Sequence, residues 1–364
     1  MSDIQHRIQS MLDRLVAEDR ERGMQVTAYL DGTKVVDCWA GTMSPGGKAV
    51  DGETLFPVYS TTKGIAATAL HILVQRGLLD YDLPIATWWP EFAANGKGGL
   101  TLRHALGHIA GVPMMPPGDL EMVCDWDAVC RGVCALTPWQ APGTRWQYHP
   151  VTYGWLIGEP AHRVDGRAFT TIVRDEVGKP LGVSSGMYIG VPEYDLHRIA
   201  TIERYPGVAP AMPPSPEPLP DVSAALVPLE EFMNKRIVQM ACIPGSNGIM
   251  TARAVAKHYA SLMGSGVDGV RLLDDATMKK ATQRQTPYPP KDADLGHGLG
   301  YALWGTVEDP GCVFGHAGYG GSIGVADTRT GLAVGLTKNR MNGPNGPHGC
   351  HQVVDELNAW ARAR

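Results

Sequence analysis

The chain has 364 residues, of which 44% are apolar and 19% are charged, and its formal net charge is −5. This composition is typical of a globular protein with room for one large two-part domain or two ordinary domains. The absence of a basic block argues against a nucleic-acid surface. The longest apolar runs are far shorter than a membrane span. We therefore expect a globular protein that binds neither nucleic acid nor membrane.

The first residues carry a charged, amphipathic pattern. Ile4, Ile8, Met11, Leu12 and Leu15 share one helical face, and the segment lacks the apolar core of a secretion signal. The seven cysteines are odd in number and widely spaced, and none forms a C-x-x-C pair. This usage favours reduced thiols. Together the two features predict a cytoplasmic protein.

Three regions have clear periodicity. Two β-rich runs flank the turn signal Asp31-Gly32, which predicts a hairpin. Apolar residues then recur at helical spacing over 65–79, and Gly77 marks the approach to the end of this helix. From about residue 298 the pattern changes to alternating, glycine-punctuated strands, followed by a last helix. Strands therefore stand near both ends of the chain.

The middle of the chain has a different texture. Residues 84–240 are rich in Pro, Gly and Trp with short helical patches, and 205–222 is a proline-rich stretch that predicts an extended surface loop. We expect an α/β (α+β) fold in which residues 1–83 and 241–364 build one domain around an antiparallel sheet flanked by the terminal helices. Residues 84–240 then form an inserted, mainly helical domain. A cleft between the two is the expected location of the site.

Ser60 and Lys63 stand three residues apart near the start of the predicted helix, so their side chains share a face. The free N–H groups of a helix start favour negative charge and the loss of a proton from a nearby lysine. A buried, neutral lysine can accept the serine proton, and the serine then attacks a carbonyl. The alternative interpretation is a Ser/Thr N-cap followed by an exposed lysine.

Two further stretches favour the catalytic interpretation. Tyr148 lies in "PGTRWQYHPVTYGWLIG", just before an apolar helix, and His316-Ala317-Gly318 opens a strand in "FGHAGYGGSIGVAD". With Ser60-x-x-Lys63, they resemble the three motifs of the serine β-lactamase and penicillin-binding protein superfamily: S-x-x-K, Y-x-N or a bare Tyr, and K-T-G or H-x-G. The resemblance covers nearly the whole chain in the right order. It is closest to the class C β-lactamase-like carboxylesterases, called family VIII esterases, and implies a β-lactamase/transpeptidase-like fold.

The resemblance also implies roles for residues. Ser60 is the acylated nucleophile, and Lys63 helps to deprotonate it. Tyr148, as tyrosinate or through a proton shared with Lys63, is the general base and returns the proton to the leaving group. The backbone N–H groups of Ser60 and Tyr319 form the oxyanion hole. His316 stands where β-lactamases carry the lysine of K-T-G and is expected to hydrogen-bond near the tyrosine or the substrate.

Two departures from the β-lactamase pattern point toward esters. Pro150 replaces the Asn of Y-x-N, and His316 replaces the lysine of K-T-G, so recognition of a carboxylate-bearing amide is weakened. An ester needs less help, because an alkoxide leaves more easily than an amine. We expect a serine carboxylesterase for short-to-medium-chain esters that needs no metal and no cofactor. A β-lactamase, a D-amino-acid amidase or peptidase, an acyltransferase and a non-catalytic scaffold stay open, as does a homo-oligomer.

Four residues are expected to support the site. Gly318 belongs to the third motif, and His149 either lines the site or orients the loop beside Tyr148. Trp146 and Trp155 flank Tyr148 and are the best candidates among the tryptophans for an apolar acyl or alcohol pocket.

Other patterns have structural explanations. Ser184 and Ser322 each match G-x-S-x-G, but neither has the strand before it and the helix after it that a nucleophile elbow needs. Two histidine pairs have a spacing compatible with a metal, His104 with His108 and His348 with His351. The first lies in a segment that the resemblance assigns to packing between the lobes. The second lies in a turn without a third ligand, so neither is interpreted as a metal site.

Overall fold

A computed structural model describes residues 3–209, 224–289, 295–343 and 348–364. The strands are β1 (Gly23–Leu30), β2 (Thr33–Gly41), β3 (Phe56–Tyr59), β4 (Met187–Ile189), β5 (Gly248–Met250), β6 (Ala302–Leu303), β7 (Val313–Ala317), β8 (Ile323–Asp327) and β9 (Leu332–Lys338). The helices are α1 (Asp3–Ala17), α2 (Thr62–Gln75), α3 (Leu102–Leu106), α4 (Leu120–Cys124), α5 (Trp126–Ala135), α6 (Tyr153–Asp165), α7 (Phe169–Val173), α8 (Leu229–Phe232), α9 (Arg236–Met240), α10 (Ala252–Ala260), α11 (Asp275–Thr282) and α12 (Gly349–Arg362).

The main sheet has six antiparallel strands in the order β2-β1-β9-β8-β7-β6. The predicted hairpin joins β1 to β2, with Leu30 paired to Thr33 across the two-residue turn. Both turn residues, Asp31 and Gly32, have positive φ (47° and 74°), as a two-residue hairpin turn of this twist requires. Strand β1 pairs with β9, so the first and last strands of the chain lie side by side in the sheet.

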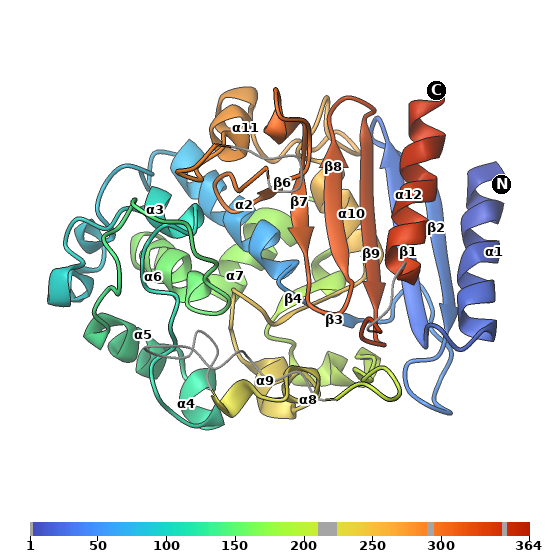
Figure 1. Cartoon of the computed structure of the whole chain (residues 1–364), viewed down its shortest axis with the longest axis horizontal. Helices are drawn as coiled ribbons and strands as arrows, with labels where there is room; N and C mark the ends of the chain where they lie inside the picture. The colour runs from blue at the N-terminus through green and yellow to red at the C-terminus, as the bar shows by residue number, and fades with distance from the viewer. Residues whose placement is uncertain (1–2, 210–223, 290–294, 344–347) are drawn as a thin grey trace.

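Helices cover both faces of this sheet. Figure 1 shows α1 and α12 on one face and α10 on the other. Ile4, Ile8 and Leu12 of α1 are buried with apolar residues of β1, β9 and α12, which explains their helical spacing in the sequence. Helix α10 packs on the opposite face against β9, β1 and β8. The antiparallel α+β architecture predicted from the sequence is confirmed.

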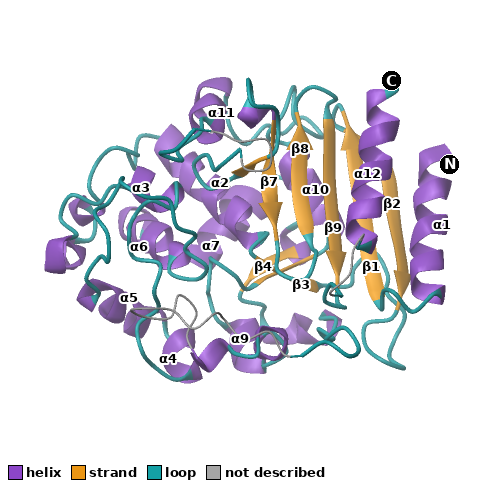
Figure 2. Cartoon of the chain, in the orientation of Figure 1, coloured by secondary structure: helices purple, strands orange, loops and turns teal. Residues whose placement is uncertain are grey.

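A second sheet departs from the prediction of a single one. Three short antiparallel strands pair in the order β3-β5-β4, and β4 comes from the segment predicted to be mainly helical. The remainder of that segment consists of helices and long loops, as Figure 2 shows. Most of the predicted proline-rich loop at 205–222 lies outside the described residues. Because β3 ends at Tyr59, the small sheet carries the chain directly to Ser60.

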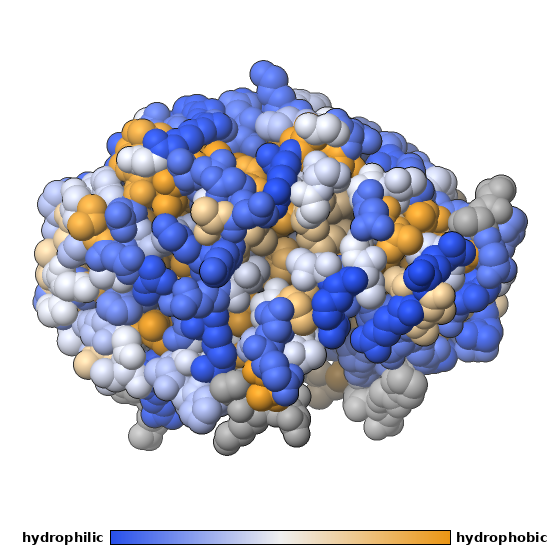
Figure 3. Space-filling model, turned by 90° about the horizontal axis from the view of Figure 1, so that it is seen from above, coloured by the Kyte–Doolittle hydropathy of each residue, from blue (hydrophilic) through white to orange (hydrophobic). Residues whose placement is uncertain are grey.

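Three features bear on disulfides, apolar patches and membrane spans: the cysteines, the surface and the length of the helices. All seven cysteines are described, and none is paired in a disulfide. Figure 3 shows a face that is mostly hydrophilic, with apolar residues in scattered small groups. Within the described ranges, no helix combines the length and the apolar character needed to cross a membrane.

Candidate active site

Ser60 lies, partly exposed, in the turn between β3 and α2. The residue before it, Tyr59, has a φ of +47°, a conformation that a bulky residue rarely adopts. Its ring contacts Phe232 and Tyr319 edge-on, with centroids 6.1 and 5.7 Å apart. Its hydroxyl donates to the Leu229 carbonyl at 2.9 Å. Surrounding contacts therefore hold the strained turn in place, as is common at functional sites.

Hydrogen bonds fix the same turn to both sheets. The Thr61 hydroxyl donates to the Ser322 carbonyl at 3.1 Å, in the turn between β7 and β8. The Gly248 N–H donates to the Thr62 hydroxyl at 2.7 Å, from β5. Helix α2 begins at Thr62, so Ser60 precedes the helix. The serine is thus positioned by two sheets and one helix.

Lys63 is completely buried, and its Nζ lies 3.2 Å from the Ser60 Oγ. The Nζ also donates to the Pro150 carbonyl at 2.7 Å and to the Gly245 carbonyl at 2.5 Å. Burial holds the pKa of Lys63 well below its usual value, which favours the neutral amine. Carbonyl oxygens only accept, so they occupy both N–H groups of a neutral amine. In a neutral amine held in this way, the remaining lone pair can accept the proton of the Ser60 hydroxyl 3.2 Å away.

Tyr148 completes the group. Its ring centroid lies 4.8 Å from the Lys63 Nζ, and the Ser60 side chain is near enough to influence the pKa of its hydroxyl. Burial raises the pKa of Tyr148 above its usual value, and the nearby Ser60 side chain lowers it by less. The phenol form is therefore favoured at neutral pH. This disfavours the tyrosinate that the resemblance allowed, and leaves a shared proton.

The third motif, His316-Ala317-Gly318, packs against the backbone just before Ser60. A side chain on Gly318 would place its Cβ 2.1 Å from the Val58 carbonyl oxygen, so glycine is required for this approach. Tyr319 follows and is 43% exposed. Within the described residues, neither the Ser60 N–H nor the Tyr319 N–H donates a hydrogen bond. Both N–H groups are therefore available as donors, as an oxyanion hole requires.

His316 is buried beside Tyr148, with ring centroids 6.1 Å apart. Its Nδ1–H donates to the Ala317 carbonyl at 2.8 Å. Its Nε2 therefore carries a lone pair, and it has no hydrogen-bond partner among the described residues. Burial lowers the pKa of His316 well below its usual value, and the nearby Lys63 and His297 add to this effect. The ring is consequently neutral at pH 7.

His108, His297 and His316 form a cluster whose candidate ligand nitrogens lie within 4.8 Å of one another. The His316 Nε2 has the bare lone pair that a metal ligand needs. However, the His108 Nδ1 accepts the His149 backbone N–H at 3.1 Å, so the neutral His108 ring carries its proton on Nε2. That nitrogen cannot ligate a metal in this tautomer. The cluster therefore fits a polar, neutral site wall better than a metal centre.

His149 positions the loop before Tyr148. It is completely buried, accepts the Val112 N–H through Nε2 at 3.2 Å and donates from Nδ1 to the Gln147 carbonyl at 2.6 Å. The Gln147 N–H in turn donates to the His108 carbonyl at 2.9 Å. Of the two roles considered for His149, these contacts support orientation of the loop.

The two tryptophans that flank Tyr148 differ. Trp146 is partly exposed and stacks on His297, with ring centroids 5.1 Å apart. Trp155 is completely buried in α6 and packs against Trp126 at 6.1 Å. Trp155 therefore belongs to the core and does not line a substrate pocket, contrary to expectation. The helical spacing of Trp155 with its apolar neighbours was consistent with this position.

The other candidates have structural roles. Ser184 begins a short 3₁₀ turn before β4, and Ser322 is only 2% exposed, so neither stands on a strand–helix elbow. The His104 Nδ1 accepts the Thr101 N–H at 3.2 Å in a capping box at the start of α3. The His348 and His351 rings are in contact at 5.3 Å, with no third ligand among the described residues.

Sequence reasoning missed three features of the site. His297 joins the histidine cluster from a glycine-rich segment that gives no local signal. The carbonyls of Pro150 and Gly245 bind Lys63, but a backbone carbonyl is present at every residue and cannot be recognised from side-chain motifs. Only their convergence on one amine distinguishes them.

The sequence and the fold are both similar to those of known proteins. The model of the family described as Beta-lactamase matches residues 8–358. The chain is 32% identical to the esterase/beta-lactamase LipL of Mycobacterium tuberculosis, over 94% of this chain and 84% of that protein.

Two solved structures are also similar, each over 98% of both chains. One is a family VIII carboxylesterase, with 29% identity and a TM-score of 0.85. The other is a penicillin-binding protein homologue from Caulobacter crescentus, with 31% identity and a TM-score of 0.83.

Proposed function

The chain belongs to the Beta-lactamase family and is a serine hydrolase, and from this premise we propose that it cleaves short-to-medium-chain carboxylic esters through an acyl-enzyme on Ser60. The observation that carries the proposal is the environment of Lys63. Two carbonyls take both N–H groups of the neutral amine, and its lone pair can accept the proton of the Ser60 hydroxyl. Such an amine is a general base in contact with a nucleophile.

Acylation begins with proton transfer from Ser60 to the Lys63 amine. The Ser60 Oγ forms a bond to the ester carbonyl carbon, and the carbonyl oxygen becomes an oxyanion. The N–H groups of Ser60 and Tyr319 stabilise this charge because they have no other acceptor. The role of Lys63 at this step is that of a base.

Tyr148 acts in the second half of the step. Its phenol gives a proton to the leaving alkoxide as the ester C–O bond breaks, and the proton on Lys63 then restores the phenol. In deacylation, water takes the place of the alcohol and the proton transfers run in reverse. The raised pKa of Tyr148 suits this role, because a phenol has a proton to give and a tyrosinate has none.

The same site favours esters over β-lactams. Pro150 has no side-chain amide with which to bind the amide of a lactam. His316 is neutral at the position where β-lactamases carry a lysine, so no positive charge there attracts a lactam carboxylate. A β-lactamase activity is the second candidate, because the relative LipL is named for both activities.

The test is hydrolysis of p-nitrophenyl esters of increasing acyl length, beside a chromogenic cephalosporin. We expect turnover of the short esters to exceed that of the cephalosporin and to be lost in Ser60→Ala. Ser184→Ala is the matched control, since this serine also has a G-x-S-x-G context but lies outside the site. Addition of an alcohol acceptor measures acyl transfer in the same assay.

Two results would contradict the proposal. Activity that survives in Ser60→Ala would overturn the nucleophile assignment. A cephalosporin that is cleaved faster than every ester would establish the β-lactamase instead.

A further inference from the structure

Tyr59, the residue directly before Ser60, has an unusual backbone conformation for its type. Six described residues other than glycine have a positive φ, and the five besides Tyr59 are Asp, Asn or His. Those three types adopt this conformation more readily than others do. A bulky tyrosine with a φ of +47° is strained, and it persists only where its surroundings hold it. The strain therefore points to a role at the site.

The conformation of Tyr59 sets the direction of one oxyanion donor. The Ser60 N–H lies in the rigid peptide plane between Tyr59 and Ser60, and the dihedral angles of Tyr59 orient this plane. Tyr59 is the last residue of β3 and pairs with Gly248 of β5, so its positive φ turns the chain out of the sheet at this point. The Ser60 N–H donates no hydrogen bond within the described residues. It is therefore available to an oxyanion.

The second oxyanion donor belongs to a residue that contacts the same side chain. The Tyr319 ring meets the Tyr59 ring edge-on, with centroids 5.7 Å apart. Gly318, the neighbour of Tyr319, packs against the carbonyl of Val58, the neighbour of Tyr59. Tyr59 thus lies between the two segments that supply the oxyanion donors, one through its backbone and the other through its ring.

Helix α8 holds the Tyr59 side chain. The Tyr59 hydroxyl donates to the Leu229 carbonyl at 2.9 Å, and the Phe232 ring packs against the tyrosine ring at 6.1 Å. Tyr59 is only 4% exposed, so this bond is shielded from water. The helix is itself fixed, because the Asn234 side chain exchanges hydrogen bonds of 2.8 and 2.9 Å with the backbone of Ile202. Tyr59 therefore has a firm support on the side away from Ser60.

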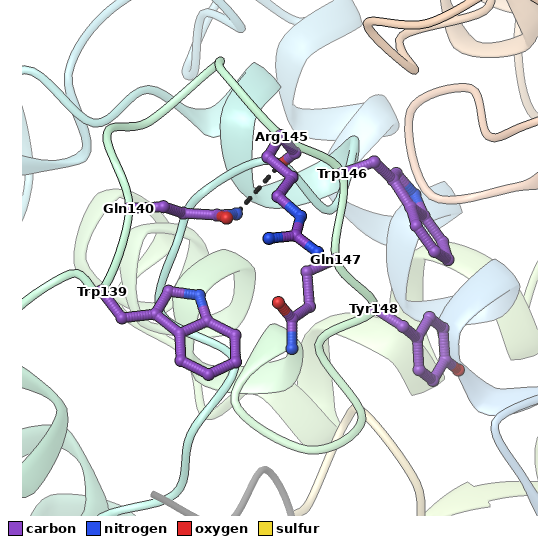
Figure 4. Close-up of a pocket in the computed structure, with 6 residues that line it drawn as sticks. All are labelled: Trp139, Gln140, Arg145, Trp146, Gln147 and Tyr148. Atoms are coloured by element: carbon purple, nitrogen blue, oxygen red, sulfur yellow. Dashed lines mark hydrogen bonds between the residues drawn. The ribbon is translucent and has the colours of Figure 1, made fainter. Parts of the chain in front are cut away.

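The cavity of about 640 Å³ beside the Tyr148 loop does not take this role. Figure 4 shows Trp139, Arg145 and Gln147 around the cavity, whereas the Tyr148 hydroxyl points away from them. The Ser60 side chain is near enough to that hydroxyl to influence its pKa. The reacting groups therefore lie on the other side of the loop, where Tyr59 precedes Ser60.

We propose that Tyr59 is a positioning residue, which directs the Ser60 N–H and sets its separation from the Tyr319 N–H so that both donors meet one oxyanion. This inference rests on the proposed function, in which the ester carbonyl oxygen becomes that oxyanion. Tyr59 acts through its neighbours, since its own hydroxyl is buried and bonded to α8. Its strained conformation preorganises the two donors before the substrate binds.

Two substitutions remove the support of Tyr59 in steps. Tyr59→Phe keeps the ring contacts and loses the bond to Leu229, and it should lower kcat for p-nitrophenyl acetate by about tenfold. Tyr59→Leu also loses both ring contacts and should lower kcat by about a hundredfold, as for removal of one oxyanion donor. KM should stay within about twofold of the wild-type value in both variants, because acylation and deacylation each form an oxyanion and are slowed together.

Tyr81→Phe is the matched control. Tyr81 is 3% exposed, follows the far end of α2, and donates its hydroxyl to the His71 Nδ1 at 2.8 Å. Tyr81→Phe should lose thermal stability as Tyr59→Phe does, but it should keep the wild-type kcat. Two results overturn the inference: an unchanged kcat in both Tyr59 variants, or a kcat that Tyr81→Phe lowers as much as Tyr59→Phe does.

Labelling of Ser60 by a fluorophosphonate separates this inference from the proposed function. In this reaction the Ser60 Oγ–P bond forms, the P–F bond breaks with release of fluoride, and the phosphonyl oxygen needs the same two donors. The labelling rate should fall in Tyr59→Phe and further in Tyr59→Leu, and it should be unchanged in Tyr81→Phe. If the wild type is labelled but hydrolyses no ester, the proposed function is contradicted and these rates decide the inference. A wild type that is not labelled overturns the inference too, because the donors then bind no oxyanion.

Discussion

Among the described residues, Lys63 and Lys97 are both completely buried, and they differ in what surrounds the amine. Lys63 in the cleft meets two carbonyls and the hydroxyl of Ser60. Lys97 in the helical region meets three carbonyls, those of Ala94 at 2.7 Å, Cys134 at 2.9 Å and Leu136. Burial lowers the pKa of both amines.

The two amines differ in their third hydrogen-bond partner, which is the Ser60 hydroxyl for Lys63 and a carbonyl for Lys97. Three carbonyl oxygens only accept, so they are satisfied together by the three N–H groups of an ammonium and oppose the loss of its proton. The Lys97 ammonium therefore ties the turn at Pro90–Gly96 to the end of α5. A hydroxyl can donate as well as accept, so Lys63 can be neutral with every group satisfied. Solvent reaches neither amine, yet the third partner favours an ammonium at Lys97 and allows a neutral amine at Lys63.

Replacement of the two lysines gives the largest expected difference. Lys63→Met should lower kcat/KM for p-nitrophenyl acetate by about a thousandfold or more, since the general base is lost. Lys97→Met should leave kcat/KM of the folded protein within about twofold, because Lys97 does not reach the cleft. The measurement is steady-state kinetics on the folded fraction of each variant.

Stability should respond differently. Lys97→Met leaves three buried carbonyls without their donor and should lower the free energy of unfolding by about 3 kcal/mol. Urea denaturation measures this change. If folded Lys97→Met were inactive while Lys63→Met remained active, the comparison of the two lysines would be wrong.

Tyr148→Phe should lower kcat by about a hundredfold, because the leaving alkoxide loses its proton donor while the ring packing is kept. Tyr153→Phe is the matched control. The Tyr153 ring also lies near the Lys63 Nζ, at 5.6 Å, but its buried hydroxyl has no partner among the described residues. Equal activity of the two phenylalanine variants would remove Tyr148 from the mechanism.

Gly318→Ala tests the contact between the third motif and the nucleophile turn. Its Cβ would lie 2.1 Å from the Val58 carbonyl oxygen, so the turn before Ser60 must shift. We expect kcat to fall by about tenfold, since oxyanion donors act only at short range. Gly99→Ala, where an added Cβ meets no atom within 4 Å, should have wild-type kinetics. An unchanged kcat in Gly318→Ala would show that this contact does not position the site.

The pH dependence tests the protonation state of Lys63 with the active site unchanged. Lys63 is active as the neutral amine, so kcat/KM should fall as the pH drops through its lowered pKa, by about tenfold per unit. No loss is expected on the mildly alkaline side, because the pKa of Tyr148 is raised. The profile of Lys97→Met should have the same midpoint. If the pH midpoint of kcat/KM moved in Lys97→Met, the loss of activity at low pH could not be attributed to Lys63.

Much of this protein follows from its sequence. The turn at Asp31-Gly32 and the apolar spacing of α1, α2 and α12 reflect local rules of twist and helical period, so they were predictable. The Ser60-x-x-Lys63 spacing indicated that two reactive side chains lie close together, and the order of three motifs indicated the family. Only the shared helical face was wrong, because Ser60 precedes α2. Strands near both chain ends likewise indicated the sheet that they build together.

Tertiary structure decided the remainder. The sequence singled out Lys63 through its motif, but it did not show that Lys97 is buried as well or which carbonyls surround each amine. The protonation state of each lysine depends on carbonyls from residues far apart in the chain. It also depends on burial, which strengthens their hydrogen bonds. The phenol form of Tyr148, the His108–His297–His316 cluster and the strained conformation of Tyr59 arise in the same way. Protonation and pairing are properties of the packed surroundings, and only the fold creates those surroundings.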